Sequence, residues 1–121
     1  MQGWTAMQML DRHHPLPGGD RIRLRLPHVT DRARVHEFLT RLGLTAHDLD
    51  VRRGLRWSAG NRWTVIATRW DGACEQIVGI AVVDASDGSP TLLAEEPAVC
   101  DLLARALAEH AGSGAPRRFV A

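Results

Sequence analysis

The chain has 121 residues, 45% of them hydrophobic and 24% charged, which is the balance of one soluble globular domain and not of a disordered chain. Its 15 basic residues, all arginine, nearly cancel 14 acidic ones, and the net charge of +1 argues against a dedicated nucleic-acid binder. No apolar run reaches the roughly 20 residues that cross a bilayer, no secretory signal opens the sequence, and two cysteines make no disulfide framework. We therefore expect a cytoplasmic domain that binds neither nucleic acid nor membrane.

The first 19 residues are predicted to form a tail, or a short helix, ahead of a domain over residues 20–121. The segment "PLPGG" at 15–19 breaks regular structure before the first clear element. Trp4, Met7 and Leu10 recur at a spacing that places them on one side of a short helix. We expect this apolar side to dock on the domain or on a neighbouring molecule.

A strictly alternating pattern over residues 20–26 predicts the first strand. Three aliphatic residues form its buried face and three arginines its solvated face: Ile22, Leu24 and Leu26 against Arg21, Arg23 and Arg25. Such a row of arginines can meet an acidic partner or RNA. An ordinary solvated face is far more common, however, and it suits the near-zero net charge.

Two helices are expected after this strand. Thr30 is a good N-cap for the first helix and Gly43 ends it, while Thr45 can cap a second helix that runs through Leu49 to Leu55. The first helix would bury four apolar side chains, namely Val35, Phe38, Leu39 and Leu42.

The second half of the chain predicts a meander of strands and one more helix. The segments "RWTVIATRW" and "EQIVGIAVVD" are rich in β-branched residues, and Asp71-Gly72 between them is a strong signal for an antiparallel hairpin. The short strand "TLLA", a helix over residues 97–111 and the strand-like "RRFVA" follow. The fold class is α/β, or α+β in strict terms, with the order β-α-α-β-β-β-α-β.

Three segments resemble the GNAT N-acetyltransferase family over about residues 20–121. They are "IRLRLPHVTDRARVHEFLTRLGLT", "WTVIATRWDGACEQIVGIAVVD" and "LLARALAEHAGSGAPRRFVA". The resemblance implies a mixed, mainly antiparallel sheet with helices on both faces, acetyl-CoA as the cofactor, and transfer of an acyl group to an amine.

In that family a loop of pattern Gln/Arg-x-x-Gly-x-Gly/Ala before the main helix holds the pyrophosphate of acetyl-CoA on backbone amides. The resemblance places Glu95, Ala98 and Cys100 at the three specified positions, and all three depart from the pattern. Glu95 and Glu96 are favoured at a helix N-terminus for the same reason as a phosphate, and Pro97 removes one N–H donor. These departures favour an acid-capped structural helix.

If the cofactor binds, the resemblance implies backbone contacts from the segment that contains Leu93, Ala94, Ala98, Val99 and Cys100. Glu95 or Glu96 is then the nearby candidate for a catalytic base. Family members continue into a further helix and two strands that wall the cofactor cleft, and they often use a catalytic tyrosine. The sequence stops at Ala121 and contains no tyrosine, so we expect weak or absent transfer.

Other candidate sites are less favoured. The dipole of the helix can lower the pKa of the Cys100 thiol, but cysteine is usually buried and two nearby glutamates oppose a thiolate. The six histidines lack the paired spacing of a metal site, so we expect no metal.

Two functions of different classes therefore stay open. One is a GNAT-like acyltransferase domain, weakly active or inactive with acetyl-CoA, and the other is a non-catalytic module that regulates or assembles with a partner. A degenerate remnant of such a domain is a third. Because "RRFVA" would lie at a sheet edge, we expect a homodimer or a protein partner there, with Leu103 or Leu107 partly bare.

Overall fold

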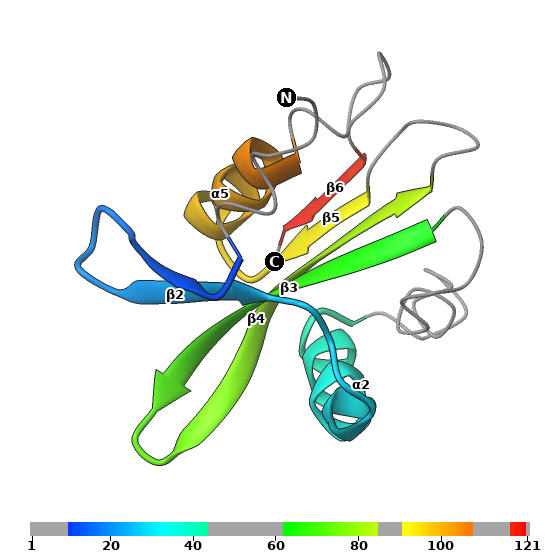
Figure 1. Cartoon of the computed structure of the whole chain (residues 1–121), viewed down its shortest axis with the longest axis horizontal. Coiled ribbons are helices and arrows are strands. Elements are labelled where there is room, and N and C mark those ends of the chain that lie inside the picture. The colour runs from blue at the N-terminus through cyan, green and yellow to red at the C-terminus, as the bar shows by residue number, and fades with distance from the viewer. Residues whose placement is uncertain (1–9, 44–61, 85–90, 108–116, 121) are drawn as a thin grey trace.

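The computed structural model describes residues 10–43, 62–84, 91–107 and 117–120 (Figure 1). Its elements are β1 (Arg12–Pro15), β2 (Arg21–Arg25), the 3-10 turn η1 (Val29–Asp31), α2 (Arg32–Arg41), β3 (Arg62–Asp71), β4 (Cys74–Asp84), β5 (Thr91–Ala94), α5 (Pro97–Leu107) and β6 (Arg117–Val120). The predicted second helix at 49–55 and the predicted end of the last helix at 108–111 lie outside the described residues.

The strands form one six-stranded sheet in the order β1-β2-β3-β4-β5-β6. Each neighbouring pair is antiparallel except β5 and β6, which are parallel and are separated in sequence by α5. The prediction of an α+β fold is confirmed, as is the antiparallel β3–β4 hairpin at Asp71-Gly72. Gly72 has a φ of 65°, the left-handed conformation that favours glycine in such a turn.

Strand β1 was not predicted. It pairs with β2 from Arg12↔Leu24 to Pro15↔Arg21, so Pro15 ends β1 and the rest of the "PLPGG" segment lies in the turn of a hairpin. Gly19 has a φ of 93°, and Leu16 in the same turn is only 8% exposed. The sequence pattern predicts a domain boundary at these residues, whereas in the structure they connect two strands of the sheet. Trp4 and Met7 lie outside the described residues.

Strand β2 alternates as predicted at two of its apolar positions, since Ile22 and Leu24 are fully buried. The prediction of a solvated arginine face is wrong at Arg25, which is only 7% exposed. The reason is that η1 and the β3–β4 hairpin bring carboxylates over this end of the strand, which a periodicity argument cannot see.

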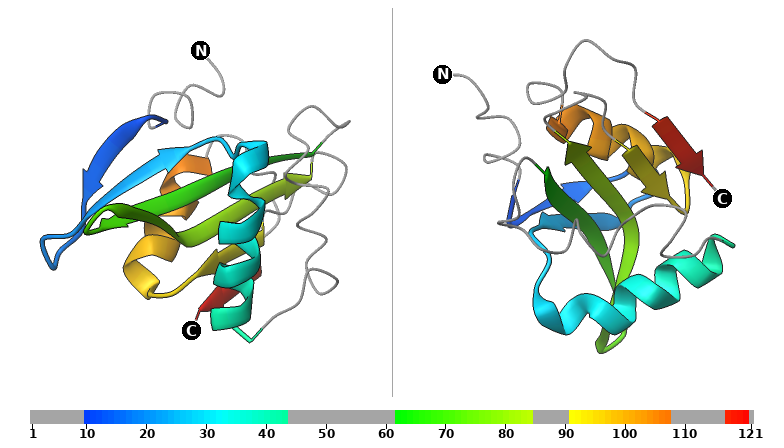
Figure 2. Two further views of the ribbon diagram at one scale, coloured as in Figure 1. Left: turned by 90° about the horizontal axis from the view of Figure 1, so that it is seen from below. Right: turned by 90° about the vertical axis from the view of Figure 1, so that its right-hand side faces the viewer.

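Two hydrophobic clusters pack the sheet. Neighbouring residues of β3 alternate between them, Val65 and Ala67 with α5 and Ile66 with α2. Figure 2 shows α2 and α5 on different sides of the strands. The expectation that Leu103 or Leu107 is partly bare is wrong, because both side chains are fully buried against the sheet.

Helix α2 buries Val35, Phe38 and Leu39 as predicted, and Gly43, with a φ of 74°, follows its end. Thr30 is not its N-cap. It lies inside η1, and Asp31 occupies the N-cap position instead. The added turn places the Asp31 carboxylate beside β2, which matters for the ion cluster described below.

A β-bulge lies in the middle of the β3–β4 pair. Ala67 pairs with Gly79 and Thr68 with Ile77, so Val78 is an extra residue on β4. Helix α5 approaches β4 closely here, because a Cβ on Gly79 would lie 2.7 Å from Val99 Cγ1 and 2.9 Å from Leu103 Cδ1. Glycine is therefore required for this close contact between helix and strand.

Candidate functional site

The predicted cofactor-binding residues lie together where β5 ends and α5 begins, because they are nearly consecutive in sequence. Four of the five side chains are fully buried: Leu93, Ala94, Val99 and Cys100. Leu93 packs in the cluster with α2, and the other three pack in the cluster with α5. Ala98 is partly buried against the latter. These side chains build the core, and only backbone remains for a cofactor.

The backbone of the junction is itself bonded. The Glu96 carbonyl accepts hydrogen bonds from the N–H groups of Val99 at 3.1 Å and Cys100 at 3.2 Å. The N–H of Glu95 donates to the carbonyl of Val78, the extra residue of the bulge, at 3.0 Å. The bulge therefore fixes the start of α5 against β4.

Both predicted catalytic carboxylates lie beside arginine side chains. Arg41 Nε, at the end of α2, donates to Glu95 Oε1 at 2.7 Å, and Arg69 Nη2, on β3, lies 3.6 Å from Glu95 Oε2. Arg69 Nη1 lies 3.6 Å from Glu96 Oε1 and 3.1 Å from Asp20 Oδ2. We call the five residues Asp20, Arg41, Arg69, Glu95 and Glu96 the α5-start cluster.

Arg41 is also held by other groups. It donates to the Ile77 carbonyl at 2.7 Å and to Glu37 at 3.2 Å, and its guanidinium lies over the Phe38 ring. The two arginines of the α5-start cluster are thus in contact with four carboxylates, those of Asp20, Glu37, Glu95 and Glu96. Glu95 and Glu96 directly precede α5 in the chain, so two carboxylates belong to the positive end of this helix, where a phosphate would otherwise be favoured.

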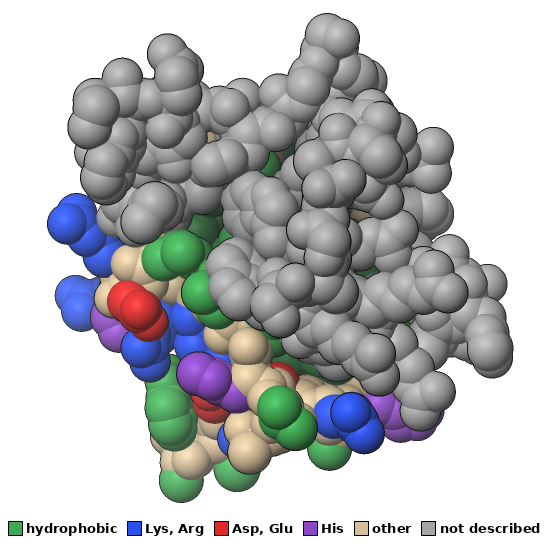
Figure 3. All heavy atoms as spheres, turned by 45° about the vertical axis from the view of Figure 1, so that its right-hand side comes forward, with side chains coloured by type: hydrophobic (Ala, Val, Ile, Leu, Met, Phe, Trp, Pro, Cys, Tyr) green, Lys and Arg blue, Asp and Glu red, His purple; other side chains and the backbone are tan. Residues whose placement is uncertain are grey.

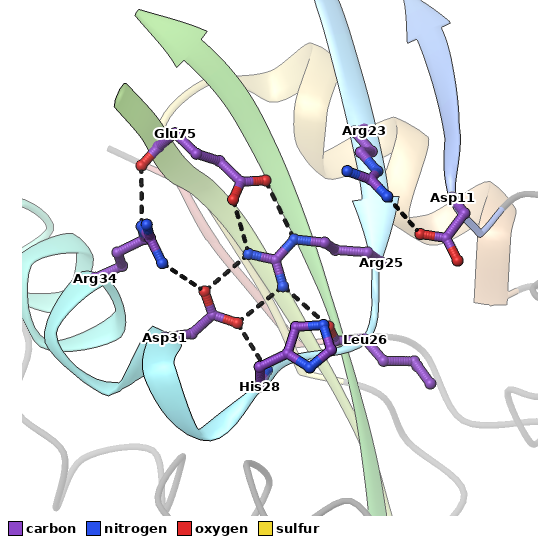
Figure 4. Close-up of polar contacts among 8 residues, drawn as sticks. All are labelled: Asp11, Arg23, Arg25, Leu26, His28, Asp31, Arg34 and Glu75. Atoms are coloured by element: carbon purple, nitrogen blue, oxygen red, sulfur yellow. Dashed lines mark hydrogen bonds and ion pairs between the residues drawn. The ribbon is translucent and has the colours of Figure 1, made fainter. Parts of the chain in front are cut away.

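A second charged cluster was missed by the sequence analysis (Figure 4). Arg25 Nη1 and Nη2 donate to the two carboxylate oxygens of Asp31, each at 2.8 Å. Arg25 Nε and Nη2 donate to the two oxygens of Glu75 at 3.1 and 3.0 Å, and Nη1 also donates to the Leu26 carbonyl. All five N–H donors of the guanidinium therefore have acceptors.

Two further donors complete this Arg25 cluster, which comprises Arg25, Asp31, Glu75 and Arg34. Arg34 donates to Asp31 at 3.1 Å and to the Glu75 carbonyl at 3.2 Å. The backbone N–H of His28 donates to Asp31 at 2.7 Å. The side chains of Arg25, Asp31 and Glu75 are only 8%, 1% and 11% exposed, so their charges are largely removed from solvent.

Both carboxylates of the Arg25 cluster have a lowered pKa, which favours their ionised form. Burial alone would raise the pKa of Asp31, but hydrogen bonds from Arg25, His28 and Arg34 outweigh it and lower the pKa to about 2. Burial and the Arg25 hydrogen bonds oppose each other in the same way at Glu75, whose pKa is lowered. The hydrogen bonds to Asp31 are the largest cause that raises the pKa of Arg25. Saturated, ionised groups of this kind join elements and do not exchange protons near neutral pH.

No local signal in the sequence marks the Arg25 cluster. Arg25 and Glu75 are 50 positions apart, and Arg25 occupies a position that the alternating pattern assigns to solvent. In the sequence, Thr30 is predicted as the N-cap of the following helix, and Asp31 has no predicted role. Its partner could be found only from the sheet order that brings β2, β3 and β4 together.

The remaining candidates can also be placed. Cys100 is buried and Cys74 is exposed. Within the described ranges, no three His, Cys, Asp or Glu side chains gather as a metal site requires, and no helix has the length and apolar character to span a bilayer. On the face in Figure 3, the described basic, acidic, histidine and hydrophobic side chains are interspersed.

Comparisons with known proteins add no relative. No family model matches the chain, and neither a curated protein nor a solved structure matches it.

Proposed function

We propose that this chain is a GNAT-like acyltransferase-fold domain in which acetyl-CoA-dependent transfer is weak or absent. The sheet order supports the first half of this proposal. A meander leads through β5 into α5, which returns to β6 parallel to β5, and α2 and α5 pack in separate clusters. These features agree with the mixed, mainly antiparallel sheet that the resemblance implies, although a fold alone does not determine an activity.

The contacts of Glu95 carry the second half of the proposal. Its carboxylate binds Arg41 at 2.7 Å and faces Arg69 directly before the N-terminus of α5. A pyrophosphate at this point would have to displace that carboxylate and tolerate Glu96 beside it. Pro97 offers no N–H, and the Val99 N–H is already bonded to Glu96. The junction therefore disfavours a phosphorylated cofactor.

The same contacts argue against Glu95 as a catalytic base. A base must accept a proton from its substrate, and a lone pair of Glu95 Oε1 is already engaged by Arg41. Glu96 is 43% exposed, and its carboxylate lies 3.6 Å from the Arg69 guanidinium. Neither carboxylate has the dry surroundings that make a carboxyl group an effective base at neutral pH.

Calorimetry with acetyl-CoA tests the proposal. We expect a Kd weaker than about 1 mM, equivalent to less than about 4 kcal/mol of binding free energy, and no acyl transfer to a panel of amines. The double variant Glu95→Gln/Glu96→Gln removes both anions while keeping their shape. A matched control is Glu37→Gln, which removes a carboxylate that contacts Arg41 from α2 instead. Low-micromolar binding together with transfer by the unmodified chain would contradict the proposal.

A non-catalytic assembly module is the second candidate function. In the described part of the sheet, β6 has β5 on one side and no strand on the other, so one row of its backbone groups is open to pairing. We propose a second copy of the chain, or another protein, as the partner at this edge. Light scattering would then give a mass near twice 13.3 kDa, and Phe119→Asp would lower it, whereas the control Val29→Asp in η1 would not.

A further inference from the structure

The end of the β3–β4 hairpin extends beyond its neighbouring strands (Figure 1). Strand β2 pairs with β3 only as far as Arg23↔Thr68, and β5 pairs with β4 only from Gly79↔Ala94 onward. Residues 69–76, which we call the hairpin ribbon, are therefore flanked by no strand in the described part of the chain. Residues 70–74 are exposed, among them Trp70 with 54% of its surface accessible.

A two-stranded ribbon in water is marginally stable when it stands alone. The hairpin ribbon has three cross-strand pairs of its own, Arg69↔Gln76, Trp70↔Glu75 and Asp71↔Cys74. It needs contacts with the rest of the domain to hold one position. Arg69 supplies ion pairs to Asp20, Glu95 and Glu96, but these lie at 3.1 to 3.6 Å between partly exposed side chains, where solvent screens them.

Glu75 supplies the stronger attachment. Both of its carboxylate oxygens accept from Arg25 in a bidentate pair, and its backbone carbonyl accepts from Arg34. Arg25 lies on β2 and Arg34 on α2, so one residue of the ribbon is held by two separate elements. The Glu75 side chain is 11% exposed, which makes this contact the least solvated of the ribbon's ion pairs.

Arg25 does not depend on Glu75 for its position. Asp31 holds the same guanidinium through a second bidentate pair, and Asp31 is fixed in turn by His28 and Arg34. The cation therefore stays in place when Glu75 leaves. This asymmetry is what a latch requires, namely a fixed receptor on the domain and one removable group on the moving part.

We propose that Glu75 is a latch that holds the hairpin ribbon against a receptor formed by Arg25 and Arg34, and that the ribbon opens as a unit when the latch is broken. Trp70 is the cross-strand partner of Glu75, so the latch also fixes where this exposed indole stands. The closed ribbon presents Trp70 in one orientation, and the open ribbon does not.

Amide hydrogen exchange of the full chain tests the latch. In Glu75→Gln, we expect the exchange of amides in residues 69–76 to rise at least about tenfold relative to that in residues 64–67 and 79–82 at the centre of the sheet. Glu75→Asp keeps the charge but shortens the side chain, so we expect a smaller rise in the same amides. Glu37→Gln, which removes an exposed carboxylate paired with Arg41, is the matched control and should change neither set.

Three results would overturn the proposal. One is unchanged exchange in the ribbon, and another is an equal rise in the ribbon and the centre of the sheet, which would mean that Glu75 acts only on the stability of the whole fold. The third is that neither Glu75→Gln nor Glu75→Asp yields folded protein, because loss of a latch on a separate unit leaves the sheet intact.

Discussion

The two charged clusters are built from the same types of residue, arginine with aspartate or glutamate, but they differ in how far their side chains are exposed to water. In the Arg25 cluster, Asp31 is 1% exposed and Arg25 8%, whereas in the α5-start cluster Arg41 is 33% and Glu95 25% exposed. Their shortest contacts are nearly equal, 2.8 Å for Arg25–Asp31 and 2.7 Å for Arg41–Glu95. Contact distance therefore does not distinguish the clusters, but access to water does.

Burial changes what each cluster can do. Removing one partner of a buried pair leaves an uncompensated charge away from water, whereas removing one partner of an exposed pair leaves a charge that water can solvate. The Arg25 cluster is consequently a structural joint between β2, η1 and β4. The ion pairs of the α5-start cluster lie between partly exposed side chains, so we expect them to contribute little to stability.

The largest expected loss of stability comes from replacing Arg25, the central cation of the buried cluster. Arg25→Leu leaves Asp31 and Glu75 buried without their main cation, and we expect a loss of about 3 to 5 kcal/mol in the free energy of unfolding. Chemical denaturation measures it. The control is Arg23→Leu on the same strand face, whose partner Asp11 is 72% exposed, and its cost should stay below about 1 kcal/mol. Equal losses in the two variants would refute the distinction based on burial.

The second largest loss of stability is expected when acid protonates the carboxylates of the Arg25 cluster. The pKa of Asp31 falls from 3.8 to about 2 on folding, so its contribution is complete above pH 4 to 5 and is lost as the pH falls toward 2. The shift corresponds to up to about 2 kcal/mol, and the lowered pKa of Glu75 acts in the same direction. Denaturation midpoints measured from pH 6 to pH 2 test this. Asp31→Asn should flatten that part of the profile, and an unchanged slope in the variant would assign the acid sensitivity to other groups.

The packing beneath the α5-start cluster should be the next most sensitive feature. Gly79→Ala places a methyl group within 2.7 Å of Val99 Cγ1 and 2.9 Å of Leu103 Cδ1. Val99 is a stiff β-branched side chain, and the Leu93 carbonyl oxygen would lie 3.2 Å from the same Cβ, so we expect a loss of about 1 to 2 kcal/mol from overpacking. Gly18→Ala is the control, because a Cβ there meets nothing within 4 Å. A Gly79→Ala variant as stable as the parent would show that the contact between α5 and β4 accommodates a methyl group without cost.

The sequence allowed prediction of the elements with strong local patterns. The β3–β4 hairpin followed from β-branched runs around Asp71-Gly72, and the buried face of α2 followed from the spacing of Val35, Phe38 and Leu39. Strand β1 could not be predicted, because "RHHP" has neither apolar alternation nor β-branched residues and forms a strand only by pairing with β2.

The candidate site was predictable in part for the same reason. The closeness of Glu95 and Glu96 to the α5 N-terminus follows from their order in the chain, but Arg41 and Arg69 come from distant elements. The burial of Arg25 depends on Asp31 and on Glu75, which local periodicity cannot connect. Long-range charge pairing, like the pairing of β1 with β2, was therefore left undetermined by sequence patterns.

The smallest expected loss of stability comes from replacing Glu95 in the partly exposed α5-start cluster. Glu95→Gln should cost less than about 1 kcal/mol at low salt, because solvent screens its pairs with Arg41 and Arg69. At about 1 M salt, where the Debye length is near 3 Å, this cost should fall toward zero, whereas the cost of Arg25→Leu should persist because buried charges are screened much less. A double-mutant cycle of Glu95→Gln with Arg41→Gln at both salt concentrations isolates the pair. A coupling energy that is large and independent of salt would mean that Glu95 and Arg41 form a structural joint like the Arg25 cluster, and the view of Glu95 as a carboxylate that mainly excludes a phosphate would then fail.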